Sequence, residues 1–337
     1  MTAGRAKAAR LLDAAVEGSV VLSFTRIGPL LRRRLMRWHR PRSNAVRGKR
    51  VVVTGGTSGI GRAAAQQLGA LGAELVIIGR DERRGAEVVA GLPGGQRRHR
   101  FIQADLTDLR DVRRVGAELL QGSPVDVLVH GAGAMFPASE LSAQGIERTL
   151  AVHVVAPFLL TALLMPALRT ARGRVIVVTS GGMYTEALNV AALRDPPADL
   201  KGAQAYARAK RAQVALVERA RPLLGDHGVD IIAMHPGWAD TPGLRASLPG
   251  FGRLLGPLLR SPDEGADTIT WLAAAPAEVL QGGTLWLDRA PRAVHRLPRT
   301  RASDTPAARA ELWRLCEELT STGGTTPSPC AEDESAE

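Results

Sequence analysis

Residues 54–61 read Thr54-Gly55-Gly56-Thr57-Ser58-Gly59-Ile60-Gly61, and this stretch decides the expected fold. It follows the β-branched run 51–53, which is typical of a buried strand, and precedes residues 62–68, which have the composition of a helix. A glycine-rich turn between a strand and a helix lets the backbone approach a pyrophosphate, whose charge then lies at the positive end of the helix. The stretch therefore predicts a bound dinucleotide, contacted by Gly55, Thr57, Ser58, Gly59, Ile60 and Gly61.

Strand-like and helix-like stretches alternate with short connections from residue 50 onward, which predicts a parallel sheet covered by helices on both faces. The strand-like runs lie at 50–53, 75–78, 100–103, 125–129, 174–178, 229–233 and 284–287. The two longest helical stretches lie at 146–169 and 203–224. We expect one α/β domain over residues 48–290, a doubly wound (Rossmann) parallel sheet of seven strands with helices on both faces.

Tyr206 and Lys210 stand at positions i and i+4 of the second long helical stretch, so their side chains lie on the same face. A phenol with a pKa near 10 is a poor base at neutral pH, but a nearby ammonium group lowers that pKa. The pair therefore predicts a proton-transfer site. Tyr206 would be the general acid when a ketone is reduced and the general base when an alcohol is oxidised.

Three motifs together resemble those of the short-chain dehydrogenase/reductase family. They are the G-x-x-x-G-x-G spacing in residues 55–61, Y-x-x-x-K in 206–210 and P-G-x-x-x-T in 236–241. Longer stretches, such as 234–243, resemble one branch of the family, and the resemblance covers most of residues 10–320. It implies an NAD(P)-dependent enzyme acting on CH-OH or C=O groups, and a homo-oligomer.

The resemblance also implies roles for residues that follow the predicted strands. Ser180 would hydrogen-bond the reacting oxygen, and Lys210 would hold the nicotinamide ribose as well as acting on Tyr206. The other cofactor contacts that it implies are Asp105 and Leu106 at the adenine, Gly131, Ala132 and Gly133 along the cofactor, and Pro236, Gly237 and Thr241 at the nicotinamide. The alternative for Asp105 is a helix cap.

Arg80 ends the second predicted strand, 19 residues after Gly61. Dinucleotide-binding folds carry an acidic residue near this position for the ribose of NAD, or an arginine for the 2′-phosphate of NADP. Arg80 therefore favours NADP(H), while the neighbouring Asp81 keeps NAD possible.

Two histidines depart from the family pattern. His130 precedes Gly131 where an asparagine is usual, and His153 aligns with the asparagine that usually holds a water in a proton relay. A neutral imidazole can hold the same water, but it titrates near pH 6.5. We therefore expect His153 either to add a pKa to the activity profile or to be a satisfied core histidine.

The formal net charge of +11 comes from residues 1–50, which hold thirteen Lys and Arg residues and two acids. Residues 1–47 are predicted to form a basic, amphipathic helical arm with one apolar stripe, interrupted near Pro29. The stripe consists of Val16, Val20, Phe24, Ile27, Leu31, Leu35 and Trp38. One interpretation is an interfacial helix, residues 11–42, that lays Arg32, Arg33, Arg34 and Arg37 on anionic lipid. The other is a helix that packs on the body or on a second subunit.

The remaining features set limits on partners and compartment. No base-reading fold accompanies the charge, which argues against nucleic acid. Two cysteines make neither a disulfide framework nor a metal cluster, so we expect no metal and a cytoplasmic, possibly membrane-associated, protein. Residues 291–320 are expected to form an extension with a helix at 305–319, and 321–337 a disordered tail.

The expected function is an NADP(H)-dependent oxidoreductase that interconverts a carbonyl and an alcohol. The leucine-rich segment 241–259, together with an insertion at 184–204, is expected to form the mouth of the site and to favour a lipophilic substrate. The alternative is a dinucleotide-binding sensor or scaffold without turnover, tethered at a membrane surface.

Overall fold

The structure is a computed structural model of the chain that describes residues 3–39, 41–42, 44–136, 140–247 and 249–321, with side chains from residue 8 onward except at 249 and 254. All but the first residue of the predicted tail lies outside the described residues, as does Cys330.

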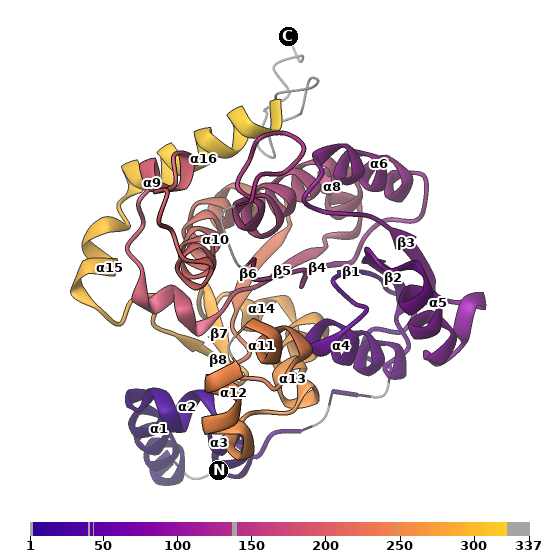
Figure 1. The fold of residues 1–337 in the computed structure, drawn as a ribbon. Coiled ribbons are helices and arrows are strands. Elements are labelled where there is room, and N and C mark those ends of the chain that lie inside the picture. Colours follow the sequence, from indigo (N-terminus) through magenta and orange to yellow (C-terminus); the bar gives the residue numbers. More distant parts are fainter. Residues whose placement is uncertain (1–2, 40, 43, 137–139, 248, 322–337) are drawn as a thin grey trace.

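The described residues form one sheet of eight strands in the order β3-β2-β1-β4-β5-β6-β7-β8 (Figure 1). The strands are β1 (Arg50–Thr54), β2 (Glu74–Gly79), β3 (Arg100–Gln103), β4 (Val127–His130), β5 (Arg174–Val178), β6 (Asp230–Met234), β7 (Leu285–Leu287) and β8 (Ala290–Arg292). The predicted doubly wound fold is confirmed. The expectation of seven parallel strands missed β8, which pairs antiparallel with β7.

The extra strand, β8, follows a two-residue turn, Asp288-Arg289, that reverses the direction of the chain. Both residues have positive φ angles, 53° and 58°, as a tight hairpin of this twist requires. That conformation is unfavourable for a side chain such as arginine. Side-chain contacts hold both residues in this conformation. Asp288 accepts hydrogen bonds from Arg32 and Arg260, and Arg289 donates to Asp267. The sequence carries no Asn-Gly or Gly-Gly signal here, which is why the hairpin was missed.

The order of the strands places the functional site. The chain moves outward from β1 to β2 and β3, then returns to the other side of β1 with β4. The loops that follow β1 and β4 therefore diverge and leave a crevice at the carboxyl edge of the sheet, where ligands bind in folds of this kind.

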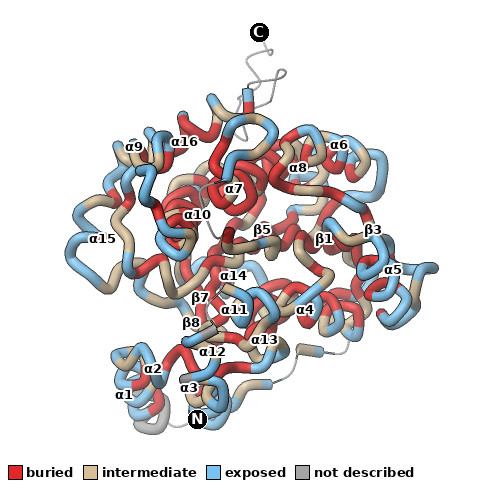
Figure 2. The backbone as a smooth tube through the Cα atoms, in the orientation of Figure 1, coloured by how far each residue is buried: buried red, intermediate tan, exposed pale blue. Residues whose placement is uncertain are grey.

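Helices cover both faces of the sheet (Figures 1 and 2). On one face pack α4 (Gly59–Ala70), α5 (Glu82–Gly91), α13 (Pro262–Ala274) and α14 (Ala277–Leu280). On the other pack α6 (Leu109–Leu120), α7 (Arg148–Leu150), the π-helical turn η2 (Ala151–Val155), α8 (Ala156–Ala171), α10 (Gly202–Gly225) and α16 (Pro306–Ser321). Short elements are the 3-10 helices η1 (Gly95–Arg97), η3 (Gly181–Thr185) and η4 (Gly256–Leu258), and α9 (Ala191–Arg194), α11 (Pro242–Ser247), α12 (Pro249–Leu255) and α15 (Pro298–Ser303).

The predicted long helices are found with small shifts at their ends. The segment Arg148–Ala171 is also long and apolar enough to cross a membrane by length and composition, but 72% of its most apolar window is buried inside the fold. It is the central helix of one face of the sheet, which accounts for its composition.

The N-terminal arm forms three helices, α1 (Ala3–Gly18), α2 (Val20–Phe24) and α3 (Ile27–Leu35). The predicted single stripe is wrong, because the chain turns at Ser19 and again at Thr25 and so points successive stripe residues in different directions. Phe24 is 2% exposed, whereas Val20 is 41% exposed. The arm packs on the body, as the second interpretation expected.

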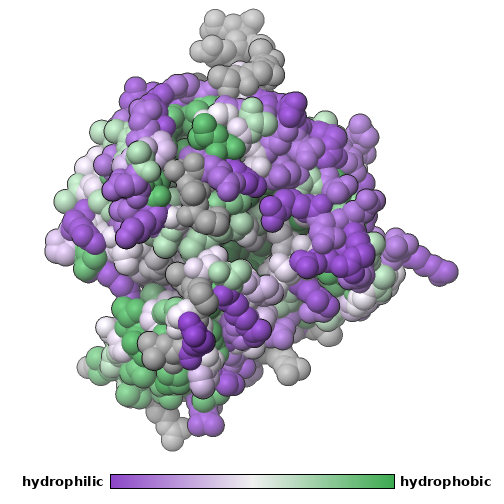
Figure 3. All heavy atoms as spheres, viewed as in Figure 1, coloured by the Kyte–Doolittle hydropathy of each residue, from purple (hydrophilic) through white to green (hydrophobic). Residues whose placement is uncertain are grey.

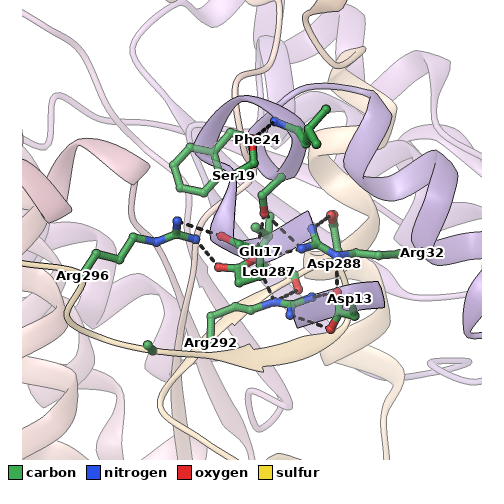
Figure 4. A network of polar contacts seen from close by, with 12 residues as sticks. Asp13, Glu17, Ser19, Phe24, Arg32, Leu287, Asp288, Arg292 and Arg296 are labelled. Atoms are coloured by element: carbon green, nitrogen blue, oxygen red, sulfur yellow. Dashed lines mark hydrogen bonds and ion pairs between the residues drawn. The ribbon is translucent and has the colours of Figure 1, made fainter. Parts of the chain in front are cut away.

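Arg32 is the main link between arm and body. It was expected on a basic outer face, yet it is only 1% exposed. Its guanidinium donates to Asp13 at 2.6 Å, Glu17 at 2.8 Å and Asp288 at 2.6 Å (Figure 4). Three carboxylates compensate for the loss of water around this cation, which is why burial is tolerated.

Candidate active site

Every residue predicted for the site lines one cavity of about 530 Å³ at the carboxyl edge of the sheet. These residues are Gly55, Thr57, Ser58, Gly59, Ile60, Gly61, Arg80, Asp105, Leu106, Gly131, Ala132, Gly133, His153, Ser180, Tyr206, Lys210, Pro236, Gly237 and Thr241. They come from the ends of six strands and from two long helices, so the fold brings together residues that lie as far as 186 positions apart in the chain.

The turn after β1 is built so that only glycine fits at its key positions. Gly55 has a φ of +70°, and a Cβ atom there would lie 2.6 Å from the backbone of Ala132. A Cβ on Gly61 would lie 2.3 Å from the carbonyl oxygen of Gly55. The turn therefore lies close to both the loop after β4 and the first turn of α4. Residues 57–61, at the start of α4, line the cavity, and the N-terminus of a helix is a binding site for anions.

The side chains of Arg80 and Asp81 point to different surroundings, and only that of Arg80 lines the cavity. Arg80 is exposed at the end of β2 and lines the cavity. Asp81 does not line it, because its side chain caps α5 by accepting from the backbone N–H of Arg84 at 2.9 Å. The cation is thus available to a ligand while the carboxylate is engaged elsewhere.

Asp105 lines the cavity, but it is partly engaged. One carboxylate oxygen accepts from the backbone N–H and the hydroxyl of Thr107, each at 2.9 Å. The alternative of a helix cap does not apply, since Asp108 caps α6.

Ser180, Tyr206 and Lys210 converge on one wall of the cavity. Ser180 follows β5 and starts η3, where its hydroxyl accepts from Gly182 N–H. Tyr206 and Lys210 share one face of α10, with the ammonium 5.4 Å from the centre of the phenol ring. Lys210 is 3% exposed, and its Nζ donates to the carbonyl of Val178 at 2.8 Å.

The protonation states differ from the expected pattern. Burial raises the pKa of Tyr206 above its ordinary value, and a hydrogen bond with Ser180 opposes this only in part. Burial also lowers the pKa of Lys210 to about 7, so the ammonium is partly deprotonated at neutral pH. The expectation that Lys210 lowers the pKa of Tyr206 below its ordinary value is therefore wrong for these groups by themselves, because desolvation is the largest effect on the phenol and the hydrogen bond with Ser180 is what opposes it.

His153 lies in the π-helical turn between α7 and α8, fully buried. Its Nε2 is 2.9 Å from the carbonyl of Ala134, so Nε2 carries the proton and Nδ1 is an acceptor. Burial, followed by the charge of Lys210, holds the pKa of His153 well below its ordinary value. An additional pKa near 6.5 is therefore not expected from this residue.

Substitution of His153 tests the protonation state of the buried imidazole. A His153→Asn variant should keep the pH dependence of kcat/KM between about pH 5 and 8, because the imidazole is neutral throughout that range. The measurement is the pH profile of both proteins with one carbonyl substrate. His153→Leu is the contrasting variant, because it removes both ring nitrogens and should lower kcat. Loss of an ionisation in His153→Asn would contradict the buried, neutral imidazole.

A family profile of short chain dehydrogenases matches residues 49–249 of this chain. The chain belongs to the short-chain dehydrogenase/reductase family. It is 37% identical over 281 residues to Dehydrogenase/reductase SDR family member 12 of Bos taurus, covering 81% of this chain and 87% of that protein. It is 36% identical over 291 residues to Polyprenol dehydrogenase of Mus musculus, covering 82% and 85% of the two chains.

The fold of this short-chain dehydrogenase/reductase also matches solved structures. A crystal structure from Beutenbergia cavernae, with NADP bound at low occupancy, is 25% identical and superimposes with a TM-score of 0.59. The match covers 72% of this chain and 95% of that chain. The chain is thus an oxidoreductase of the family, acting on CH-OH or C=O groups with an NAD(P) cofactor.

The hydroxyl group of Thr54 braces the loop after β4 in this short-chain dehydrogenase/reductase, a role expected of the asparagine that His130 replaces. Thr54 Oγ1 accepts from the backbone N–H groups of Gly131 and Ala132, each at 3.1 Å, and donates to the carbonyl of Val129. His130 instead turns into the core, 2.8 Å from Thr161 Oγ1, where burial lowers its pKa to about 3. The β4 loop is therefore braced although the amide is missing.

Phe24 supports the site from behind the cavity wall, and sequence reasoning missed this role. A Cβ on Gly181 would lie 2.4 Å from the ring of Phe24, and a Cβ on Gly237 would lie 2.6 Å from its carbonyl oxygen. The same carbonyl accepts from Trp238 N–H at 2.8 Å. An arm residue thus supports both the loop after Ser180 and the Pro236-Gly237 turn. No local signal indicates this contact, because it joins residues more than 150 positions apart.

The mouth of the cavity matches the expectation only in part. Leu244, Ser247 and Phe251 of the 241–259 segment line it, together with Phe136 from the β4 loop. Of the insertion, residues 184–204, only Thr185 and Ala203 do so. Part of the insertion contacts the C-terminal extension instead, where Leu188 N–H donates to Ser303 at 2.9 Å and Arg194 pairs with Glu318.

Proposed function

We propose that this protein is an NADP(H)-dependent oxidoreductase that interconverts a carbonyl and an alcohol on a lipophilic substrate. The convergence of Ser180, Tyr206 and Lys210 on one wall of the cavity carries the proposal. When bound along residues 55–61, the cofactor would supply or accept the hydride at the substrate carbon. Tyr206 delivers or accepts the proton at the substrate oxygen, and the Ser180 hydroxyl holds that oxygen. This argues against a sensor or scaffold, which has no physical need of the three groups together.

The phenol of Tyr206 is suited to donate a proton when a carbonyl is reduced. A phenol with a raised pKa is protonated at neutral pH, and a protonated phenol is the acid that reduction needs. Oxidation needs the phenolate, which is scarce under the same conditions. Tyr206 is therefore assigned as the general acid of carbonyl reduction in the proposed chemistry.

The choice of NADP(H) over NAD(H) is supported by the guanidinium of Arg80 at the end of β2. In the described part of the chain, the Arg80 guanidinium has no carboxylate partner, while Asp81 is committed to capping α5. A 2′-phosphate placed at the end of β2 would meet a cation there and no free acid.

Arg80→Asp is expected to weaken NADPH binding by about 10- to 150-fold, since a charge-assisted contact of this kind is worth roughly 1.5–3 kcal/mol. NADH binding should change little, or improve. The measurement is a titration that follows energy transfer from tryptophan to the reduced nicotinamide, for which Trp238 in the cavity wall is well placed.

Arg83→Asp is the matched control, because Arg83 is exposed on the neighbouring helix and pairs with Glu87 outside the cavity. It should leave both affinities unchanged. Equal NADPH and NADH affinities in the unaltered protein would remove the NADP(H) assignment but keep the enzyme. Failure to bind either, in a folded sample, would favour the scaffold.

The lipophilic substrate is supported by the mouth of the cavity. Leu244, Phe251 and Phe136 offer apolar side chains there, and Trp238 packs edge-on against Phe251 with ring centres 5.1 Å apart. One relative is named Polyprenol dehydrogenase. A panel of carbonyls with increasing chain length should show KM falling as the apolar part grows.

A further inference from the structure

We propose that the outer face of the N-terminal arm docks on a bilayer of anionic phospholipid. The outer face means the exposed side chains of residues 8–42, on α1, α2, α3 and the segment that follows. The proposal does not depend on the function of the cavity.

Large apolar side chains are concentrated on this face. Of the eleven large hydrophobic residues that are exposed in the described part of the chain, seven lie between residues 11 and 31. They are Leu11 (64% exposed), Leu12 (53%), Val20 (41%), Val21 (47%), Leu22 (38%), Leu30 (51%) and Leu31 (36%). Figure 3 shows hydrophobic residues gathered over the lobe of α1 and α2, beside a mostly hydrophilic surface. Contiguous apolar surface of this kind marks an interaction site.

The inward side of α1 carries both of its acids beside the buried Ala9 and Val16, so this helix does not turn all of its large apolar residues toward the core. Its two acids face inward, where Asp13 binds Arg32 and Arg292, and Glu17 binds Arg32 and Arg296 (Figure 4). Because the polar side of the helix is used to hold the arm on the body, the side that carries Leu11 and Leu12 is left outside.

The charges around the apolar side chains have a single sign. In the part of residues 8–42 whose side chains are described, every exposed side chain that is charged at neutral pH is an arginine. These are Arg10, Arg26, Arg33, Arg34, Arg37 and Arg42. The nearest body acid is Asp267, which lies 3.7 Å from Arg33 and is bound by Arg289. Leucine and valine surrounded by arginine fit the boundary between acyl chains and anionic headgroups.

A second copy of the chain fits this face less well. In a symmetric dimer the same patch meets itself, so the arginines of one copy would lie against those of the other. Anionic lipid supplies the opposite charge and a deformable apolar layer together. The arm is also fixed to the body, because Arg32 of the arm binds Asp288, and Arg260 of the body binds the carbonyl of Ser23 and the same Asp288.

The position of the face suits delivery of a lipid-soluble molecule to the cavity. Arg26 N–H donates to the carbonyl of Leu258 at 2.9 Å, and Phe24 packs on Trp238 at the cavity wall. Docking would place the 241–259 segment next to the membrane. This consequence, unlike docking itself, rests on the proposed function.

The test is co-sedimentation of the full chain with vesicles. Binding is expected to vesicles of phosphatidylcholine with about 30% phosphatidylserine, to weaken as salt rises from about 0.05 to 0.5 M, and to be weak on phosphatidylcholine alone. Leu11→Ser with Leu12→Ser should reduce the partition coefficient by about 10-fold or more. Arg10→Ser with Arg34→Ser should reduce it by about 5-fold per arginine.

Matched controls come from exposed residues of the same types elsewhere. Leu120→Ser with Leu141→Ser, and Arg301→Ser with Arg314→Ser, should leave vesicle binding unchanged.

Absence of binding in the unaltered protein, or equal losses in patch and control variants, would overturn the proposal. If the Leu11/Leu12 variant changes the molar mass in light scattering but not vesicle binding, the face is a protein interface and the proposal is wrong. Unchanged far-UV dichroism establishes that each variant is folded, and Leu30→Ser with Leu31→Ser provides a second apolar pair.

Discussion

Tyr206→Phe should lower kcat by about 100- to 10,000-fold in either direction, because it removes the proton donor and acceptor at the reacting oxygen. Cofactor affinity and the melting temperature should change little, since the ring stays in place and only the hydroxyl is lost. The measurement is single-turnover oxidation of NADPH by a lipophilic carbonyl, with cofactor binding followed separately. Retained turnover would exclude Tyr206 as the general acid.

Tyr184→Phe is the matched control, as Tyr184 is the other tyrosine of the chain. Its hydroxyl donates to the carbonyl of Ala293 at 2.8 Å, away from the cavity. The substitution should cost about 1 kcal/mol of stability and leave kcat unchanged. With the unaltered protein, reduction should persist up to alkaline pH, and oxidation should rise with pH, because the pKa of Tyr206 is raised.

Arg32→Met is expected to lower the free energy of unfolding by about 3–5 kcal/mol. Methionine fills a similar space but leaves the inward acids Asp13 and Glu17, and Asp288 of the hairpin turn, without the cation they share. The measurement is equilibrium unfolding in urea. We also expect kcat/KM to fall, because a loosened arm no longer holds Phe24 beneath the Ser180 loop and the Pro236-Gly237 turn.

Arg34→Met separates this effect from the loss of one positive charge. Arg34 lies on the same helix but is exposed. Surface substitutions of this kind change stability by about 0.5 kcal/mol or less. If both variants lose the same stability, the buried network is not what holds the arm to the body. For the same reason, deleting residues 1–47 should damage the site as well as remove the arm.

The sequence by itself determined the features that depend on neighbouring residues. Alternating apolar runs predicted the strands and helices, and the glycine spacing of 55–61 predicted the turn after β1, because backbone conformation there is a local property. Tyr206 and Lys210 could be placed on one face from helical geometry alone. Since parallel strands end at one edge of the sheet, residues that follow the strands could also be assigned to a common site.

Only the tertiary structure decided what depends on contacts between distant segments. Asp288 meets Arg32 across 256 positions of sequence, and this contact accounts for the burial of the arginine and holds one residue of the unforeseen hairpin turn. The direction of the Tyr206 and Lys210 pKa shifts likewise follows from burial, which no spacing in the chain encodes. The physical reason is that desolvation and ion pairing are properties of the whole packed environment, whereas periodicity and turn chemistry are properties of a few successive residues.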